Sequence, residues 1–98
     1  MKLLLDLSVS KSAKVSLLHN GQVVQEKTGT DPILIIDELL KSQHLSLNDL
    51  DEADAVPGPG SFTGLKVGAA IANAINYALG RKKLIKLIYE AKASKLSS

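Results

Sequence analysis

The chain of 98 residues contains no cysteine and no tryptophan. Without thiols it can form neither a disulfide nor a thiolate metal site. Its two histidines, His19 and His44, are far apart in the sequence and cannot by themselves supply the ligands of a zinc site. The composition therefore predicts a protein that holds no metal.

Aromatic side chains are scarce as well, with one phenylalanine and two tyrosines in the whole chain. Phe62, Tyr77 and Tyr89 are scattered, so they do not form the platform on which single-strand binders stack bases. The formal net charge is only +2, whereas a dedicated nucleic-acid binder is strongly basic. We therefore expect no direct contact with nucleic acid.

Long apolar runs are also missing. The leucines that follow Met1-Lys2 end at Asp6, which makes this stretch too short for a secretory signal. The later apolar stretch is shorter than a membrane span. We therefore expect a cytoplasmic protein without membrane contact, and 98 residues fit one domain with a modest core.

The first third of the chain predicts three strands. Residues 3–7 are nearly all apolar, as in a central strand that is covered on both faces. Residues 14–18 and 22–26 flank Asn20-Gly21, and Asn-Gly is a strong hairpin signal because both residues accept positive φ. The pattern predicts one strand followed by a β-hairpin.

Two helices and two more strands are expected after the hairpin. Asp31 followed by Pro32 is typical of an N-cap and a first helical position, so we predict a helix over residues 32–42. We further predict a short strand over residues 53–56, a helix over residues 61–79 that Gly80 ends, and a last strand over residues 84–88. The tail, residues 91–98, is expected to fray.

The most unusual segment, residues 58–68, reads Gly-Pro-Gly-Ser-Phe-Thr-Gly-Leu-Lys-Val-Gly. It is not a Walker loop, because three residues instead of four separate its second and third glycines and Leu65 stands where the lysine is needed. It is not a Rossmann fingerprint either, because Thr63 occupies the position of the third small residue.

Gly60, Gly64 and Gly68 are spaced by four, and Ala72 continues the row. Such a row leaves a stripe where a backbone or an anion can approach closely. Residues 67–80 carry no charge, and a helix that is apolar all round needs cover on every side. We expect one face on the sheet and the opposite face, with the glycine row, against a partner. The alternatives are a phosphate cradle and a turn that needs glycine only for its backbone conformation.

The glycine segment closely resembles the motif of the TsaB (YeaZ) family, in which a strand runs into Gly-Pro-Gly-Ser-Phe-Thr-Gly, Leu or Val, a basic residue and a helix. Leu3-Leu4-Leu5-Asp6-Leu7-Ser8 is similar to the family's first strand, and Asn20-Gly21 to its hairpin turn. Residues 45–51 resemble its acidic approach to the fourth strand. The resemblance covers residues 1 to about 90 and implies a role in bacterial synthesis of tRNA threonylcarbamoyladenosine (t6A).

The resemblance also implies a fold. The expected order βββαβαβ is that of a single ribonuclease-H-like lobe of the actin, sugar-kinase and Hsp70 (ASKHA) superfamily, an α/β fold with a mixed sheet and helices. Residues 1–90 would form this lobe. The family has two such lobes, and we expect the second to be absent from this chain.

By this resemblance the chain is an accessory subunit and not an enzyme. It would form a heterodimer with the catalytic paralogue TsaD, reach the ATPase TsaE through that complex, and form a homodimer when alone. The two helices build the contact with TsaD in this family. The residues carried over to the partner interface are Ile33, Ile36, Leu40, Gly60, Gly64, Leu65, Gly68, Ala72 and Asn76.

A candidate phosphate site consists of Asp6, Ser8 and Lys66, because catalytic members of the superfamily place an acidic residue and hydroxyls around magnesium and phosphate. The alternative is that Asp6 ends a strand and Ser8 makes local turn hydrogen bonds. No cofactor is expected to bind tightly to this chain. Binding of ATP or ADP is expected only within the complex. Two other functions stay open: a nucleotide-binding phosphotransferase-like lobe, and a structural homodimer without a role in the pathway.

Overall fold

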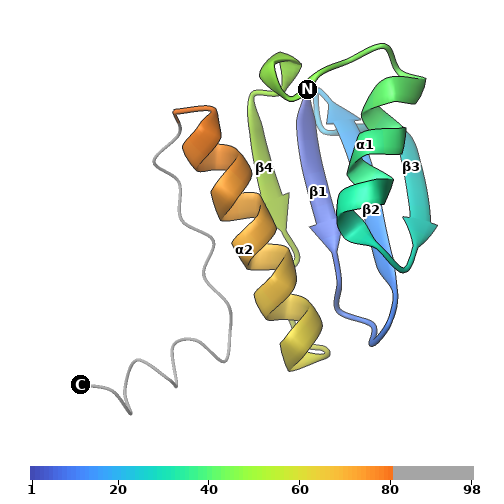
Figure 1. Cartoon of the computed structure of the whole chain (residues 1–98), viewed down its shortest axis with the longest axis vertical. Helices are drawn as coiled ribbons and strands as arrows, with labels where there is room; N and C mark the ends of the chain where they lie inside the picture. Colours follow the sequence, from blue (N-terminus) through green and yellow to red (C-terminus); the bar gives the residue numbers. More distant parts are fainter. Residues whose placement is uncertain (81–98) are drawn as a thin grey trace.

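The computed structural model describes residues 1–80. In chain order they form β1 (Lys2–Asp6), β2 (Ala13–His19), β3 (Gln22–Gly29), α1 (Pro32–Ser42), the short 3-10 helix η1 (Leu47–Asp49), β4 (Glu52–Ala55) and α2 (Phe62–Ala78) (Figure 1). The strands and helices predicted within these residues are all present, and η1 was not predicted. The last strand and the tail predicted from the sequence lie outside the described residues.

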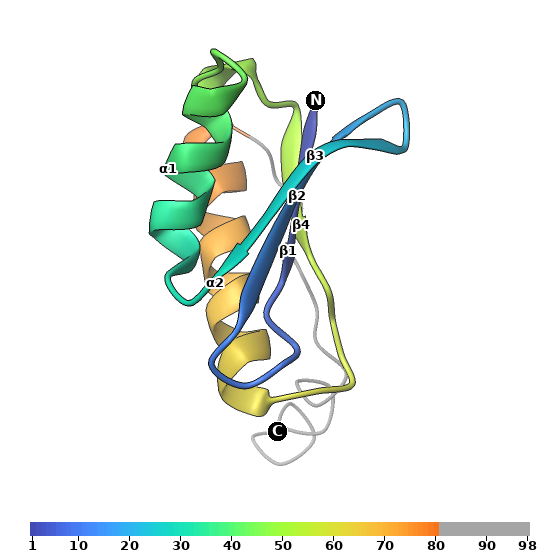
Figure 2. The ribbon, with the colours of Figure 1, turned by 90° about the vertical axis from the view of Figure 1, so that its right-hand side faces the viewer.

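The four strands form one mixed sheet in the order β3-β2-β1-β4. β1 pairs antiparallel with β2 and parallel with β4. Both helices lie on the same face of this sheet (Figure 2). Leu3 and Leu5 point toward that face and are fully buried, whereas the alternate residues of β1 are partly exposed. The α/β fold with a mixed sheet is therefore confirmed.

Two local predictions are confirmed by the backbone. Asn20 and Gly21 have φ angles of 54° and 79°, as the predicted hairpin turn requires. The carboxylate of Asp31 accepts hydrogen bonds from the backbone N–H groups of Ile33 and Leu34 at 3.0 and 3.2 Å. Asp31 is therefore the N-cap of α1, and Pro32 is its first residue.

The glycine loop brings the start of α2 against the end of β1. The backbone N–H of Ser61 donates a hydrogen bond to the carbonyl oxygen of Ser8 at 2.8 Å. A Cβ atom on Gly60 would lie 2.5 Å from that carbonyl oxygen, and one on Gly64 would overlap the carbonyl oxygen of Leu7. Only glycine permits so close an approach of two backbones.

The expectation that the glycine row faces away from the sheet is wrong. Gly68 points toward Leu7 and Ala55, and Leu65, Ala72 and Asn76 are 3%, 0% and 0% exposed. The physical reason lies in β4, whose helix-facing residues are Ala53 and Ala55. Because alanine side chains are short, close packing requires α2 to approach β4 with its small residues facing the strand.

The sequence predicted a partner contact for Gly60, Gly64, Leu65, Gly68, Ala72 and Asn76. Four of the six are buried on the side of α2 that faces the sheet, and the Cβ directions of Gly60 and Gly64 are blocked by the chain's own backbone. The small-residue row is therefore an internal packing surface in this arrangement. Among the described residues, no helix is long and apolar enough to span a membrane.

The two glycines of α2 give a paired stability prediction. Gly64→Ala should lower the free energy of unfolding by about 1–3 kcal/mol, because the new methyl group meets a backbone carbonyl that cannot move aside. Gly68→Ala should raise it by about 0.5–1 kcal/mol, because its Cβ would lie 3.7 Å from its neighbours and alanine favours the helix. Urea denaturation of both variants measures the difference, and equal effects of the two changes would contradict this packing.

Candidate functional site

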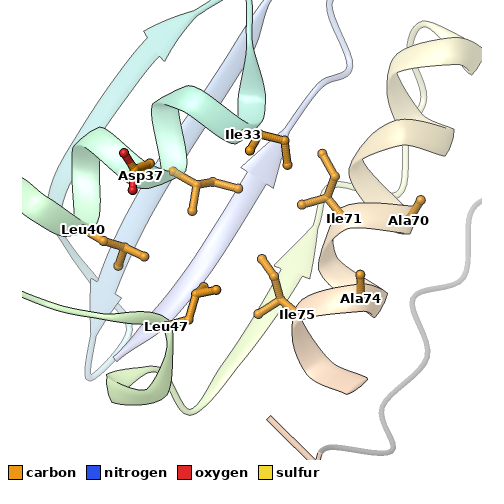
Figure 3. Close-up of a pocket in the computed structure, with 9 residues that line it drawn as sticks. Ile33, Asp37, Leu40, Leu47, Ala70, Ile71, Ala74 and Ile75 are labelled. Atoms are coloured by element: carbon orange, nitrogen blue, oxygen red, sulfur yellow. The ribbon is translucent and has the colours of Figure 1, made fainter. Parts of the chain in front are cut away.

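An apolar groove with a volume of about 440 Å³ lies between α1 and α2 (Figure 3). One charged residue, Asp37, is found among the described residues that line it. The lining residues come from α1, η1 and α2, and are Ile33, Ile36, Asp37, Leu40, Leu47, Ala70, Ile71, Ala74 and Ile75.

The groove has a buried floor and an exposed rim. Ile36, Leu40 and Ile75 are 6%, 5% and 8% exposed and continue the hydrophobic core to the surface. At the rim, Ile33 is 60% exposed, and its side chain points toward Ile71 on the opposite helix (Figure 3). A large aliphatic side chain left in water beside an apolar hollow is typical of an interaction surface.

The charge at the rim is compensated. The Nζ atom of Lys41 lies 3.0 Å from a carboxylate oxygen of Asp37, one helical turn away. Both side chains are more than half exposed, so this ion pair contributes little to stability. On the other wall, Ala70 and Ala74 are exposed and small, which lets another helix come near the axis of α2. The shape and the nearly uncharged lining of the groove therefore suit an apolar helical surface.

Sequence reasoning found part of this groove. Ile33, Ile36 and Leu40 were predicted interface residues, and all three line it. The α2 wall was missed, although Ala70, Ile71, Ala74 and Ile75 follow the i, i+4 spacing of one helix face. Leu47 was missed because it lies on η1, which the sequence did not predict.

The candidate phosphate residues are arranged as a local turn. One carboxylate oxygen of Asp6 accepts hydrogen bonds from the hydroxyl of Ser8 at 2.6 Å and from its backbone N–H at 3.1 Å. The hydroxyl bond is the main reason why the pKa of Asp6 lies below its usual value, with the backbone bond and Lys14 adding to it and burial opposing it. Neither bond involves Lys66, an exposed residue of α2.

A second hollow, of about 450 Å³, lies at the carboxyl end of β1 between the first turns of α1 and α2. Asp6, Ser8 and Lys66 are not among its lining residues. The described residues that line it include Lys11 and five residues with hydroxyl side chains, Ser10, Ser12, Thr30, Ser61 and Thr63. Over residues 1–80, no group of three or more acidic or histidine side chains is placed to hold a metal ion.

A family model described as "TsaD: tRNA N6-adenosine threonylcarbamoyltransferase" matches residues 31–87, more than half of the chain. A "tRNA threonylcarbamoyladenosine biosynthesis protein TsaB" from Haemophilus influenzae is 40% identical over 81 residues, which are 76% of this chain and 34% of that protein. A protein of the same name from Buchnera aphidicola is 32% identical over 94 residues, or 89% and 42% of the two chains. The chain thus spans less than half the length of these relatives.

Solved structures agree with these relatives. "YeaZ from Pseudomonas aeruginosa" superposes with a TM-score of 0.71 at 26% identity and covers 88% of this chain and 44% of that one. A crystal structure of an uncharacterized protein with similarity to peptidase YeaZ, also from Pseudomonas aeruginosa, gives 0.72 at 26% identity, with 88% and 42% covered. The chain therefore belongs to the family of the TsaD model and, within it, to the TsaB (YeaZ) proteins.

Proposed function

We propose that this chain is a non-catalytic, cytoplasmic partner of TsaD in the synthesis of t6A in tRNA, and that TsaD binds in the groove between α1 and α2. The observation that carries the proposal is the groove itself, with Ile33 60% exposed at its rim. The names of the relatives and of the family model support the pathway.

The outer surface of α2 supports the same partner. No charged residue occurs on this helix after Lys66, and Val67 and Tyr77 are 40% and 86% exposed. Ala70 and Ala74 lie between them and are exposed as well. Together with the groove they form a broad apolar surface that two helices of a partner can cover as a four-helix bundle.

We assign the described elements to the first ribonuclease-H-like lobe of the ASKHA superfamily. Nucleotide chemistry belongs to TsaD in this proposal, with ATP or ADP bound only in the complex and TsaE recruited through it. The hydrogen bonds from Ser8 to Asp6 support a non-catalytic role, because they keep this carboxylate in a local turn.

Replacing the exposed isoleucine by a charged residue should weaken partner binding. Ile33→Glu should weaken the affinity for TsaD by about 10-fold to 100-fold, because burying an isoleucine contributes roughly 1.5–3 kcal/mol and the described residues that line the groove include no cation for the new carboxylate. Titration calorimetry with TsaD from the same organism measures the effect. The matched control is Val23→Glu on β3, where a similarly exposed valine, 56% against 60%, lies outside the groove. Equal losses in the two variants would reject the groove as the binding site.

Without TsaD the same surface should join two copies of the chain. A few buried isoleucine and leucine anchors per subunit, each worth roughly 1.5–3 kcal/mol, outweigh a cost of association of roughly 4–15 kcal/mol. Sedimentation should show a homodimer that becomes a monomer in Ile33→Glu. TsaD should compete with formation of this homodimer. A homodimer that binds TsaD without dissociating would show that the two contacts use separate surfaces.

The phosphotransferase-like alternative draws support from the hollow at the end of β1, whose lining includes serine and threonine residues. On our proposal the purified chain hydrolyses ATP no faster than buffer, because no positioned base is found in the described residues. A coupled phosphate-release assay tests this. Turnover that survives repurification and disappears in Asp6→Ala would favour the alternative.

A further inference from the structure

β3 forms the edge of the sheet that lies opposite β4. Within residues 1–80, it pairs with β2 on one side and stands at the end of the strand order. Residues 22–28 of this strand are all exposed. An edge strand presents backbone N–H and C=O groups that can pair with a strand of another molecule, so proteins protect such edges.

The two halves of β3 differ in charge. In the second half, Glu26 accepts a hydrogen bond from the hydroxyl of Ser16 at 3.3 Å, and the Nζ atom of Lys27 lies 3.6 Å from the carboxylate of Glu38. The first half, residues 22–25, carries no charge, and its two valines, residues 23 and 24, are 56% and 46% exposed. Exposed β-branched residues on an uncharged edge favour pairing with a further strand.

The uncharged half is also self-complementary. Gln22-Val23-Val24-Gln25 reads the same in both directions. When two such segments pair antiparallel about a two-fold axis, valine lies opposite valine and glutamine opposite glutamine. No like charges are opposed in this arrangement. The strand that best fits the edge is therefore β3 of a second copy of the chain.

A β-bulge lies within the same four residues. Leu17 of β2 is opposite Gln25, and the next residue, Leu18, is opposite Val23, so Val24 is one extra residue in β3. Such a residue disrupts the hydrogen-bond ladder locally and bends the strand. The turn between β2 and β3 bends away from the helices at this end of the sheet (Figure 2). A regular strand that approaches from outside therefore meets backbone groups that are not evenly spaced.

We propose that the bulge at Val24 protects this edge, because it prevents β3 from pairing antiparallel with β3 of a second copy of this chain. Charged side chains and bulges are two ways in which sheet edges are protected. In β3 the charges lie in the second half, and the bulge lies in the half without charge. Residues 22–25 do not line the groove between α1 and α2. This role is therefore separate from the partner binding proposed there.

The test is deletion of Val24, which removes the extra residue and allows all other pairs between β2 and β3 to keep their register. The uncharged segment then reads Gln-Val-Gln, which is still the same in both directions. Sedimentation should show a shift from monomer to dimer as the concentration of this variant rises. In the dimer, the amide protons of β3 should exchange about 10-fold more slowly than in the monomer.

Two further variants provide the controls. Val24→Thr keeps the bulge and a β-branched side chain, so it should remain a monomer. Adding Val23→Lys to the deletion should restore the monomer, because two lysines would be opposed at the two-fold axis. All variants are made in the Ile33→Glu background, which removes association through the groove. Because they share this background, the comparison does not depend on the proposed function.

A folded deletion variant that stays monomeric would overturn the proposal, as would association that Val23→Lys leaves unchanged. If the deletion variant does not fold, the double variant Glu26→Gln, Lys27→Gln replaces it. This variant removes the charges of β3 and keeps the bulge, so it should remain a monomer. Its association would show that charge, and not the bulge, protects the edge.

Discussion

The close approach of α2 to the end of β1 determines the rest of this structure. Gly64 lies against the carbonyl of Leu7 with no room for a methyl group, and Ser61 is hydrogen-bonded to Ser8. A helix held further out would lose its contact with Ala53 and Ala55. Asn76 would then no longer reach β4, and the wall of the groove formed by α2 would move away from α1. The glycine loop is therefore a requirement of packing between two backbones, which was one of the alternatives that the sequence left open.

Local chemistry made much of the fold predictable. Asn20-Gly21 and Asp31-Pro32 act within a few residues, so their outcome does not depend on the rest of the chain. The direction of the glycine row is different. Because α2 carries no charge after Lys66, no polar face marks its solvent side, and spacing alone cannot tell which apolar face lies on the sheet. The alanines of β4 decide this, and their effect appears only in three dimensions.

The α1 side of the groove was predictable because α1, unlike most of α2, has charged residues that distinguish its polar side from its apolar side. Glu38 and Lys41 mark the polar side of α1, with Asp37 at the rim of the groove, and so leave its apolar residues to the sheet and the groove. Asn76 shows the opposite limit. As an asparagine in an apolar helix it was predicted to face a partner, and only the position of Ala53 opposite it reveals a buried pair of hydrogen bonds.

The attachment of α2 at both ends has a consequence for the kinetics of binding. Near its start α2 is held by the Ser61–Ser8 hydrogen bond, and near its end by Asn76 on Ala53. A surface fixed in this way is preorganised, so a partner loses little free energy to ordering it. Substitutions at the groove should then change the lifetime of a complex much more than the rate at which it forms.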